Sequence, residues 1–144
     1  MEIYQKTLAT LRALYHYYQT AHWQSKGSQY YGDHLLFQRL YDATAIDIDL
    51  VGEKALGICQ DDSVVDLKQN MAFVLKIVNN LDYAPDTQFE SALKLERAFV
   101  KLCNDQAKED TNSEGVKNMF AGLADKHEGH IYLMQQRIKG LKVI

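Results

Sequence analysis

The sequence predicts an all-α protein, a four-helix bundle with a short additional helix between the second and third long helices. Apolar residues recur at steps of three and four along most of the chain, as they do on one face of a helix, and no alternating strand pattern interrupts them. The chain contains one Pro and eight Gly, fewer turn-forming residues than a β-sandwich or barrel needs. Its 144 residues suit one domain with its own core, so we expect a single domain over residues 1–144.

The first predicted helix covers residues 2–26. Its apolar face is formed by residues at alternating steps of four and three, namely Tyr4, Leu8, Leu11, Tyr15, Tyr18 and His22. Because His22 continues this face, we expect its side chain to be shielded from bulk water. The helix should end in a turn over Gly27–Gly32, since glycine permits the positive φ that ends many helices.

The second predicted helix covers residues 33–58, with Asp33 as its N-cap. One face carries core-type residues, which are Phe37, Tyr41, Ile48, Gly52 and Ala55. A second face about a quarter-turn away carries His34, Gln38, Asp42, Ala45, Asp49 and Glu53. Two faces of different chemistry indicate that one packs inside the subunit and the other meets a partner.

Three further helices follow polar or proline-containing breaks. The short helix should be capped by Asp62 or Ser63 and continue to about residue 81. Pro85 disfavours helix before it, so Asp86 or Thr87 should cap the third long helix, which runs to about residue 109.

The fourth long helix is predicted to start after Asn112 or Ser113, either of which can cap it. Its apolar residues continue to about residue 139, and Gly140 is the expected stop signal.

Composition excludes several classes of function. The formal net charge of -3 offers no general attraction to nucleic acid or anionic lipid. No apolar run reaches the roughly 20 residues of a membrane span, and the first residues carry no signal-peptide pattern. Cys59 and Cys103 form no CxxC pair, which suits a reducing compartment. We therefore expect a cytoplasmic location.

Four residues between positions 22 and 53 have the chemistry of metal ligands. Asp49 and Glu53 are four residues apart on one helix, so their carboxylates project to the same side. They form either a solvated acidic face or a cation site. His22 and His34 flank the first turn, which places them at similar heights on antiparallel helices. Carboxylates with imidazoles suit Fe, Mn or Zn.

Helix geometry prevents these residues from binding one ion within a single subunit. His34 and Asp49 are roughly 22 Å apart along the same helix, at 1.5 Å per residue. A second copy crossing antiparallel about a two-fold axis near Asp42 would bring His22 and His34 of one chain against Asp49 and Glu53 of the other. If these four residues are ligands, the protein is therefore an oligomer.

The pattern H-W-x3-G-x6-H from His22 to His34, followed by Y-D and then D-x3-E from Asp49 to Glu53, resembles the Dps family of mini-ferritins. The resemblance implies a ferritin-like fold and a hollow cage of twelve subunits. It also implies that the two histidines and two carboxylates form an intersubunit ferroxidase centre, with Trp23 beside it. Such a centre oxidises Fe(II), preferably with hydrogen peroxide, or with dioxygen, and the cage stores the ferric product, which protects against oxidative stress.

This sequence departs from the family pattern at two places. Family members usually carry a carboxylate one turn after the second histidine, where this chain has Gln38. The second iron position is thereby weakened, and either Asp42 or Asp33 is available to compensate. The basic N-terminal tail of DNA-binding members is also missing, so we do not expect DNA binding.

Two alternatives remain open. Gln38 is compatible with a non-catalytic cage of the same fold, and the ligand types are compatible with a helical bundle that binds Zn or Mn.

For most of the remaining histidine, cysteine and acidic side chains, the sequence predicts packing or surface positions. His127 and His130 with Glu128 match a ferritin E-x2-H motif only loosely, so they are expected at the surface or an interface. His16 is expected to be a packing or exposed histidine, and the two cysteines to be buried hydrophobes. Acidic residues around the connection of the third and fourth long helices form either a solvated loop or an iron-entry pore at a three-fold axis, and they are Asp105, Glu109, Asp110 and Glu114.

Overall fold

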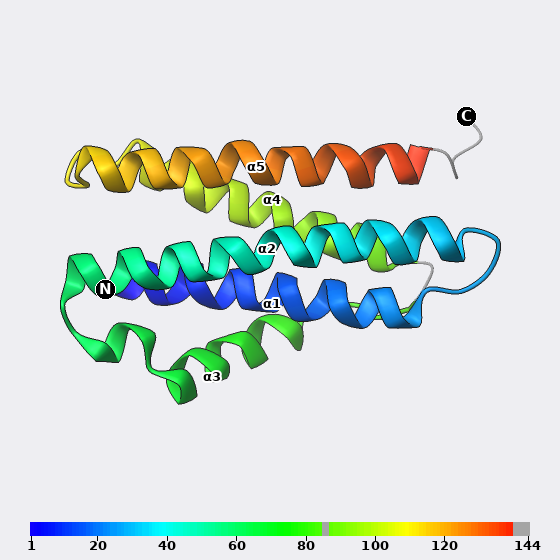
Figure 1. Cartoon of the computed structure of the whole chain (residues 1–144), viewed down its shortest axis with the longest axis horizontal. Coiled ribbons are helices and arrows are strands. Elements are labelled where there is room, and N and C mark those ends of the chain that lie inside the picture. The colour runs from blue at the N-terminus through cyan, green and yellow to red at the C-terminus, as the bar shows by residue number, and fades with distance from the viewer. Residues whose placement is uncertain (85–86, 140–144) are drawn as a thin grey trace. The chain divides into compact units, whose positions relative to one another are not determined.

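A computed structural model describes residues 1–84 and 87–139 and confirms the all-α prediction. These residues form five α-helices and one 3₁₀ turn, with no strand among them (Figure 1). The elements are α1 (Glu2–Gln24), α2 (Tyr30–Cys59), η1 (Asp62–Val65), α3 (Leu67–Val78), α4 (Gln88–Ala107) and α5 (Glu114–Lys139). They divide into two compact units, Met1–Gln88 and Phe89–Ile144, which are described separately.

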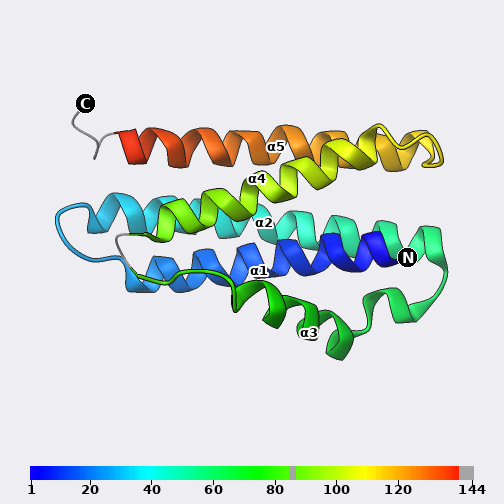
Figure 2. The same ribbon diagram turned by 180° about the vertical axis from the view of Figure 1, so that it is seen from behind.

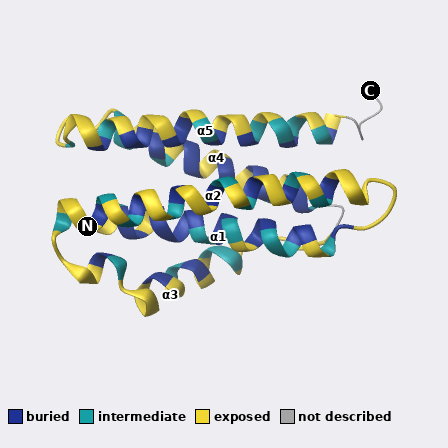
Figure 3. Cartoon of the chain, in the orientation of Figure 1, coloured by how far each residue is buried: buried dark blue, intermediate teal, exposed yellow. Residues whose placement is uncertain are grey.

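In the first unit, α1 and α2 run antiparallel as a long hairpin (Figures 1 and 2). The predicted apolar face of α1 is buried except for half-buried Tyr15, and the rings of Tyr18 and Phe37 lie 6.1 Å apart across the hairpin. The predicted core face of α2 is only partly buried, since Phe37 and Ala55 are buried whereas Tyr41, Ile48 and Gly52 are half-buried. Figure 3 shows buried and exposed residues on different faces of the same helix, the pattern that the three-to-four spacing predicts.

The turn between α1 and α2 is shorter than predicted. Gly27 has φ +87°, as expected of a turn glycine, but Gly32 already lies within α2. The prediction that Asp33 caps the second helix is wrong, because α2 begins at Tyr30 and the Asp33 amide donates to the Gln29 carbonyl, 2.9 Å away. Asp33 is instead buried in the first turn of α2, where a negative charge interacts favourably with the helix dipole.

The predicted short helix is resolved into two elements with separate caps. Asp61 caps η1 by accepting from the Ser63 amide, and Asp66 caps α3 by accepting from the Gln69 amide. The predicted caps Asp62 and Ser63 therefore lie inside η1. The helix α3 packs along α1 (Figure 2), where buried Asn70 donates to the Gln5 carbonyl over 3.0 Å.

The second unit contains α4 and α5, joined by a polar loop. Ser113 is the cap of α5, since its Oγ accepts from the Val116 amide at 3.2 Å, and Asn112 instead donates to the Gln106 carbonyl. The start of α4 at Gln88 directly follows Thr87. Asp86 and Gly140, the other predicted boundary residues, lie outside the described residues.

Candidate metal centres

His22 and His34 form a stacked pair at the end of the α1–α2 hairpin. Their ring centroids are 3.6 Å apart and their planes differ by 17°. His22 is 7% exposed and His34 is partly exposed. The prediction that antiparallel helices bring these two residues together at similar height is thus matched by the geometry.

Each histidine of this pair is held by the backbone of the other. His22 Nδ1 donates to the His34 carbonyl over 2.6 Å, and His34 Nδ1 donates to the His22 carbonyl over 2.8 Å. A carbonyl can only accept, so both Nδ1 atoms carry their proton. In the neutral imidazoles, Nε2 is then the atom with a lone pair for a metal.

Aromatic rings surround the pair on two sides. Tyr30 stacks on His34 with centroids 5.1 Å apart, and Tyr41 meets His22 edge-on at 5.4 Å. These contacts restrict both imidazoles to one orientation. Trp23 follows His22 directly but is 66% exposed, so it lies on the surface of the described chain.

The predicted carboxylate ligands lie elsewhere on the same unit. Asp49 and Glu53 are exposed on α2, and because α2 is one continuous helix, Asp49 is roughly 22 Å along its axis from His34. A single subunit does not bring the four residues together. Gln38 and Asp42 are exposed between the two groups.

Large apolar side chains are exposed on α2 alongside these polar residues. Those with the greatest exposure are Tyr31, Leu35, Ile46, Leu50 and Ile58. A run of such side chains on one helix is typical of a surface that another protein covers.

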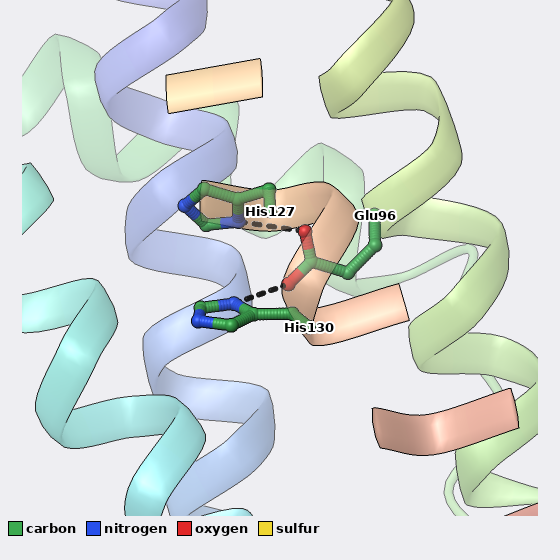
Figure 4. Close-up of side chains that lie close together, drawn as sticks. All are labelled: Glu96, His127 and His130. Carbon is green, nitrogen blue, oxygen red and sulfur yellow. Dashed lines mark hydrogen bonds and ion pairs between the residues drawn. The ribbon is translucent and has the colours of Figure 1, made fainter. Parts of the chain in front are cut away.

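A second group of ligand-type side chains belongs wholly to the α4–α5 unit. Glu96 of α4 faces His127 and His130 of α5 (Figure 4), and ligand atoms of all three lie within 4.8 Å of one another. Within the described part of the chain, no other group of three or more His, Cys, Asp or Glu residues meets that distance. We call these three residues the Glu96 cluster.

The Glu96 carboxylate bridges the two imidazoles. His127 Nδ1 is 2.7 Å from Oε2 and His130 Nδ1 is 3.2 Å from Oε1. Glu96 and His127 are fully buried and His130 is 6% exposed. The ring of Phe99 packs edge-on against His127 with centroids 4.7 Å apart.

Burial and hydrogen bonding act in opposite directions on Glu96. Burial raises the pKa of its carboxyl, but hydrogen bonds from His127 and His130, and positive charge on those rings, outweigh it. Together these effects lower the pKa of the Glu96 carboxyl from 4.5 to about 2, so this buried carboxyl is ionised at neutral pH.

The expectation that His127 and His130 lie at the surface or an interface is wrong, because both are buried within the subunit. Only Glu128, the third residue of that motif, is exposed. Sequence reasoning missed Glu96 entirely. A signal for the cluster was present, since all three residues occupy the apolar stripe of their helix, Glu96 between Leu93 and Phe99.

The other side chains that the sequence singled out have simpler environments. His16 is exposed with its ring edge-on to Tyr15, and Cys103 is a buried thiol. Cys59 is half-buried rather than buried. The four acidic residues around the α4–α5 connection are all exposed, Asp105 and Glu114 at the helix ends and Glu109 and Asp110 in the loop, so they remain either a solvated surface or a pore lining.

Comparison with solved structures identifies the fold. Dps from Thermosynechococcus elongatus aligns over 94% of this chain and 87% of its own, with 16% sequence identity and a TM-score of 0.77. The Dps protein from Vibrio cholerae O1, described as a member of a broad superfamily of ferritin-like diiron-carboxylate proteins, aligns over 95% and 87%, with 14% identity and a TM-score of 0.57.

The sequence matches no protein-family model and no curated protein sequence. Among the described residues, no helix is both long and apolar enough to cross a membrane. The structural likeness extends over nearly the whole chain and agrees with the motif from His22 to Glu53. The chain therefore has the ferritin-like helical fold of the Dps proteins.

Proposed function

We propose that the chain is the subunit of a cytoplasmic mini-ferritin that oxidises Fe(II) at intersubunit sites and stores the ferric product in a hollow cage. Hydrogen peroxide, or dioxygen, is the oxidant, and twelve subunits assemble from two-fold dimers. The ligands are His22 and His34 of one subunit with Asp49 and Glu53 of another. The fold supports this proposal, and one feature of the site carries it.

That feature is the parallel stacking of His22 and His34. The lone pair of an imidazole nitrogen lies in the plane of its ring. Two rings whose centroids are 3.6 Å apart and whose planes differ by 17° have planes that meet only about 12 Å away, whereas a metal–nitrogen bond is about 2 Å long. The two rings therefore serve two neighbouring metal positions rather than one. Two such positions let one peroxide take its two electrons from two Fe(II) ions.

The carboxylates come from a second copy of the chain. Asp49 and Glu53 project to the same side of α2, next to the exposed apolar side chains described above. An isologous contact through α2 would cover that apolar surface and build two identical sites at once. Aspartate and glutamate oxygens also favour Fe(III) over Fe(II), which assists electron loss.

The redox balance is simple. Two Fe(II) ions each lose one electron, and one hydrogen peroxide takes up both electrons with two protons to give two water molecules. Pairwise reduction avoids release of hydroxyl radical. Trp23, which follows His22 and is exposed, is the proposed electron donor when only one iron is bound.

Gln38 supports the second candidate, a cage without efficient oxidation. It is exposed on α2 one helical turn after His34, and an uncharged amide binds iron more weakly than a carboxylate does. Loss of the second iron position would leave storage without rapid two-electron chemistry. Asp42, the next exposed acid along α2, is the residue that would compensate.

Stopped-flow absorbance after addition of Fe(II) and peroxide tests the proposal. The wild-type protein should give a fast ferric signal above buffer, and Glu53→Gln should reduce its rate at least about 100-fold, as loss of a directly acting group does. Glu90→Gln, an exposed charge-matched change on α4, should leave it unaltered. A wild-type trace equal to buffer rejects the ferroxidase and favours the non-catalytic cage.

A further inference from the structure

The Glu96 cluster has no part in the function proposed above. All three of its residues belong to the α4–α5 unit, and none is among the intersubunit ligands. Burying a carboxylate and two imidazoles is costly unless each is paired. A buried, preorganised set of three ligand-type groups therefore calls for an explanation of its own.

We propose that Glu96, His127 and His130 bind one divalent first-row transition-metal ion, of the Fe(II), Mn(II), Co(II) or Zn(II) class, inside the α4–α5 unit of each subunit. Two imidazoles and one carboxylate are a donor set that such ions use, and three protein ligands leave further positions for water. With one carboxylate in the group, the site holds one ion and not a bridged pair.

The two histidine–carboxylate distances are close to those between neighbouring ligands of a single ion. Ligand atoms bound at about 2.1 Å lie about 3.0 Å apart around an octahedral ion and about 3.4 Å apart around a tetrahedral one. The 3.2 Å between His130 Nδ1 and Glu96 Oε1 is already in this range. The 2.7 Å between His127 Nδ1 and Oε2 must widen by roughly 0.3–0.7 Å, a small side-chain rotation.

Helix spacing and packing hold the ligands in place. His127 and His130 are three residues apart on α5 and so project to one side of it, and Glu96 approaches from α4 (Figure 4). Phe99 against the edge of His127 supplies an apolar wall, which limits solvent access to a metal. Metal binding replaces protons that the imidazoles now share with the carboxylate, and the positive charge of the ion interacts favourably with ionised Glu96.

Diffraction from crystals of the wild-type protein soaked in Co(II) tests the site directly. Data at the cobalt absorption edge should show an anomalous peak between Glu96, His127 and His130. A purely structural triad held together by protons predicts no peak there. Peaks confined to Asp49 and Glu53 would overturn this proposal and leave the intersubunit site untouched. A peak only at the Glu96 cluster would support this proposal and count against the intersubunit site.

Co(II) titration in solution, followed by visible ligand-field absorption, gives the affinity. His130→Gln should weaken the binding that gives this signal at least about 100-fold, beyond the loss seen when an outer-shell partner is removed. Glu128→Gln, an exposed change two residues away on the same helix, is the matched control and should bind as wild type. Equal affinity in His130→Gln and wild type refutes the assignment, and His127→Gln replaces His130→Gln if the latter fails to fold.

Discussion

Mixing two inactive variants tests whether each proposed iron site draws on two subunits. His34→Ala removes a ligand from one half-site and Glu53→Ala removes one from the other. Both residues lie on α2, where 19 residues separate them by roughly 28 Å of helix. No side chains of one subunit span that distance to a shared ion, so complementation must occur between chains.

The expected recovery follows from two-fold symmetry. A mixed dimer holds one site that lacks both ligands and one site that is intact. Equimolar co-refolding makes about half of the dimers mixed, so about a quarter of wild-type sites return from two inactive parents. The assay is the initial rate of Fe(II) oxidation per chain in stopped flow. Wild-type protein taken through the same unfolding and refolding sets the reference.

A mixture as inactive as its parents, beside a fully active refolded reference, would refute the intersubunit geometry. Recovery well above one quarter would also count against it, since a two-fold dimer offers no more intact sites. Size-exclusion chromatography with light scattering should show the same oligomer in all samples. A stable monomer would remove the basis of the site altogether.

Three further outcomes test the fold and the Glu96 cluster by chemical denaturation. In metal-free protein, the lowered pKa of Glu96, about 2 against 4.5, stabilises the fold fully above pH 4.5. Wild type should therefore lose about 1.4 kcal/mol more per pH unit than Glu96→Gln as pH falls from 4.5 towards 2, and parallel profiles would contradict this. Phe37→Ala, at a fully buried ring, should cost about 3–5 kcal/mol in the free energy of unfolding. Gly27→Ala should destabilise by about 1 kcal/mol because φ is +87°, whereas Gly32→Ala, inside α2 with open space at its Cβ, should stabilise slightly.

The sequence predicted those features that depend on local spacing. Three-to-four periodicity located the long helices, and the apolar stripe ending at His22 correctly indicated its burial. Ser113 as a cap also followed from local chemistry. Helix starts were predicted less accurately. The helix α2 begins three residues before Asp33, and the backbone hydrogen bonds that form this first turn can be made by any residue type.

The Glu96 cluster depends on contacts that no local pattern reports. Glu96 and His127 are 31 residues apart, and their meeting is decided by how α4 and α5 face each other. The sequence indicated surface or interface residues there because His127 stands where a ferritin E-x2-H motif has Glu. Each of the three residues interrupts an apolar stripe, which indicates burial, as it did for His22, but does not indicate which of them meet.

The reciprocal bonding of His22 and His34 has a consequence for how quickly the protein can respond to iron. Each imidazole is anchored to the backbone beside the other, and the loop between them is closed by both bonds. The conformational entropy of ordering these ligands is therefore lost during folding and not when metal arrives. Capture of iron at this end of the hairpin should then follow the arrival of the ion, without a slow rearrangement of the chain.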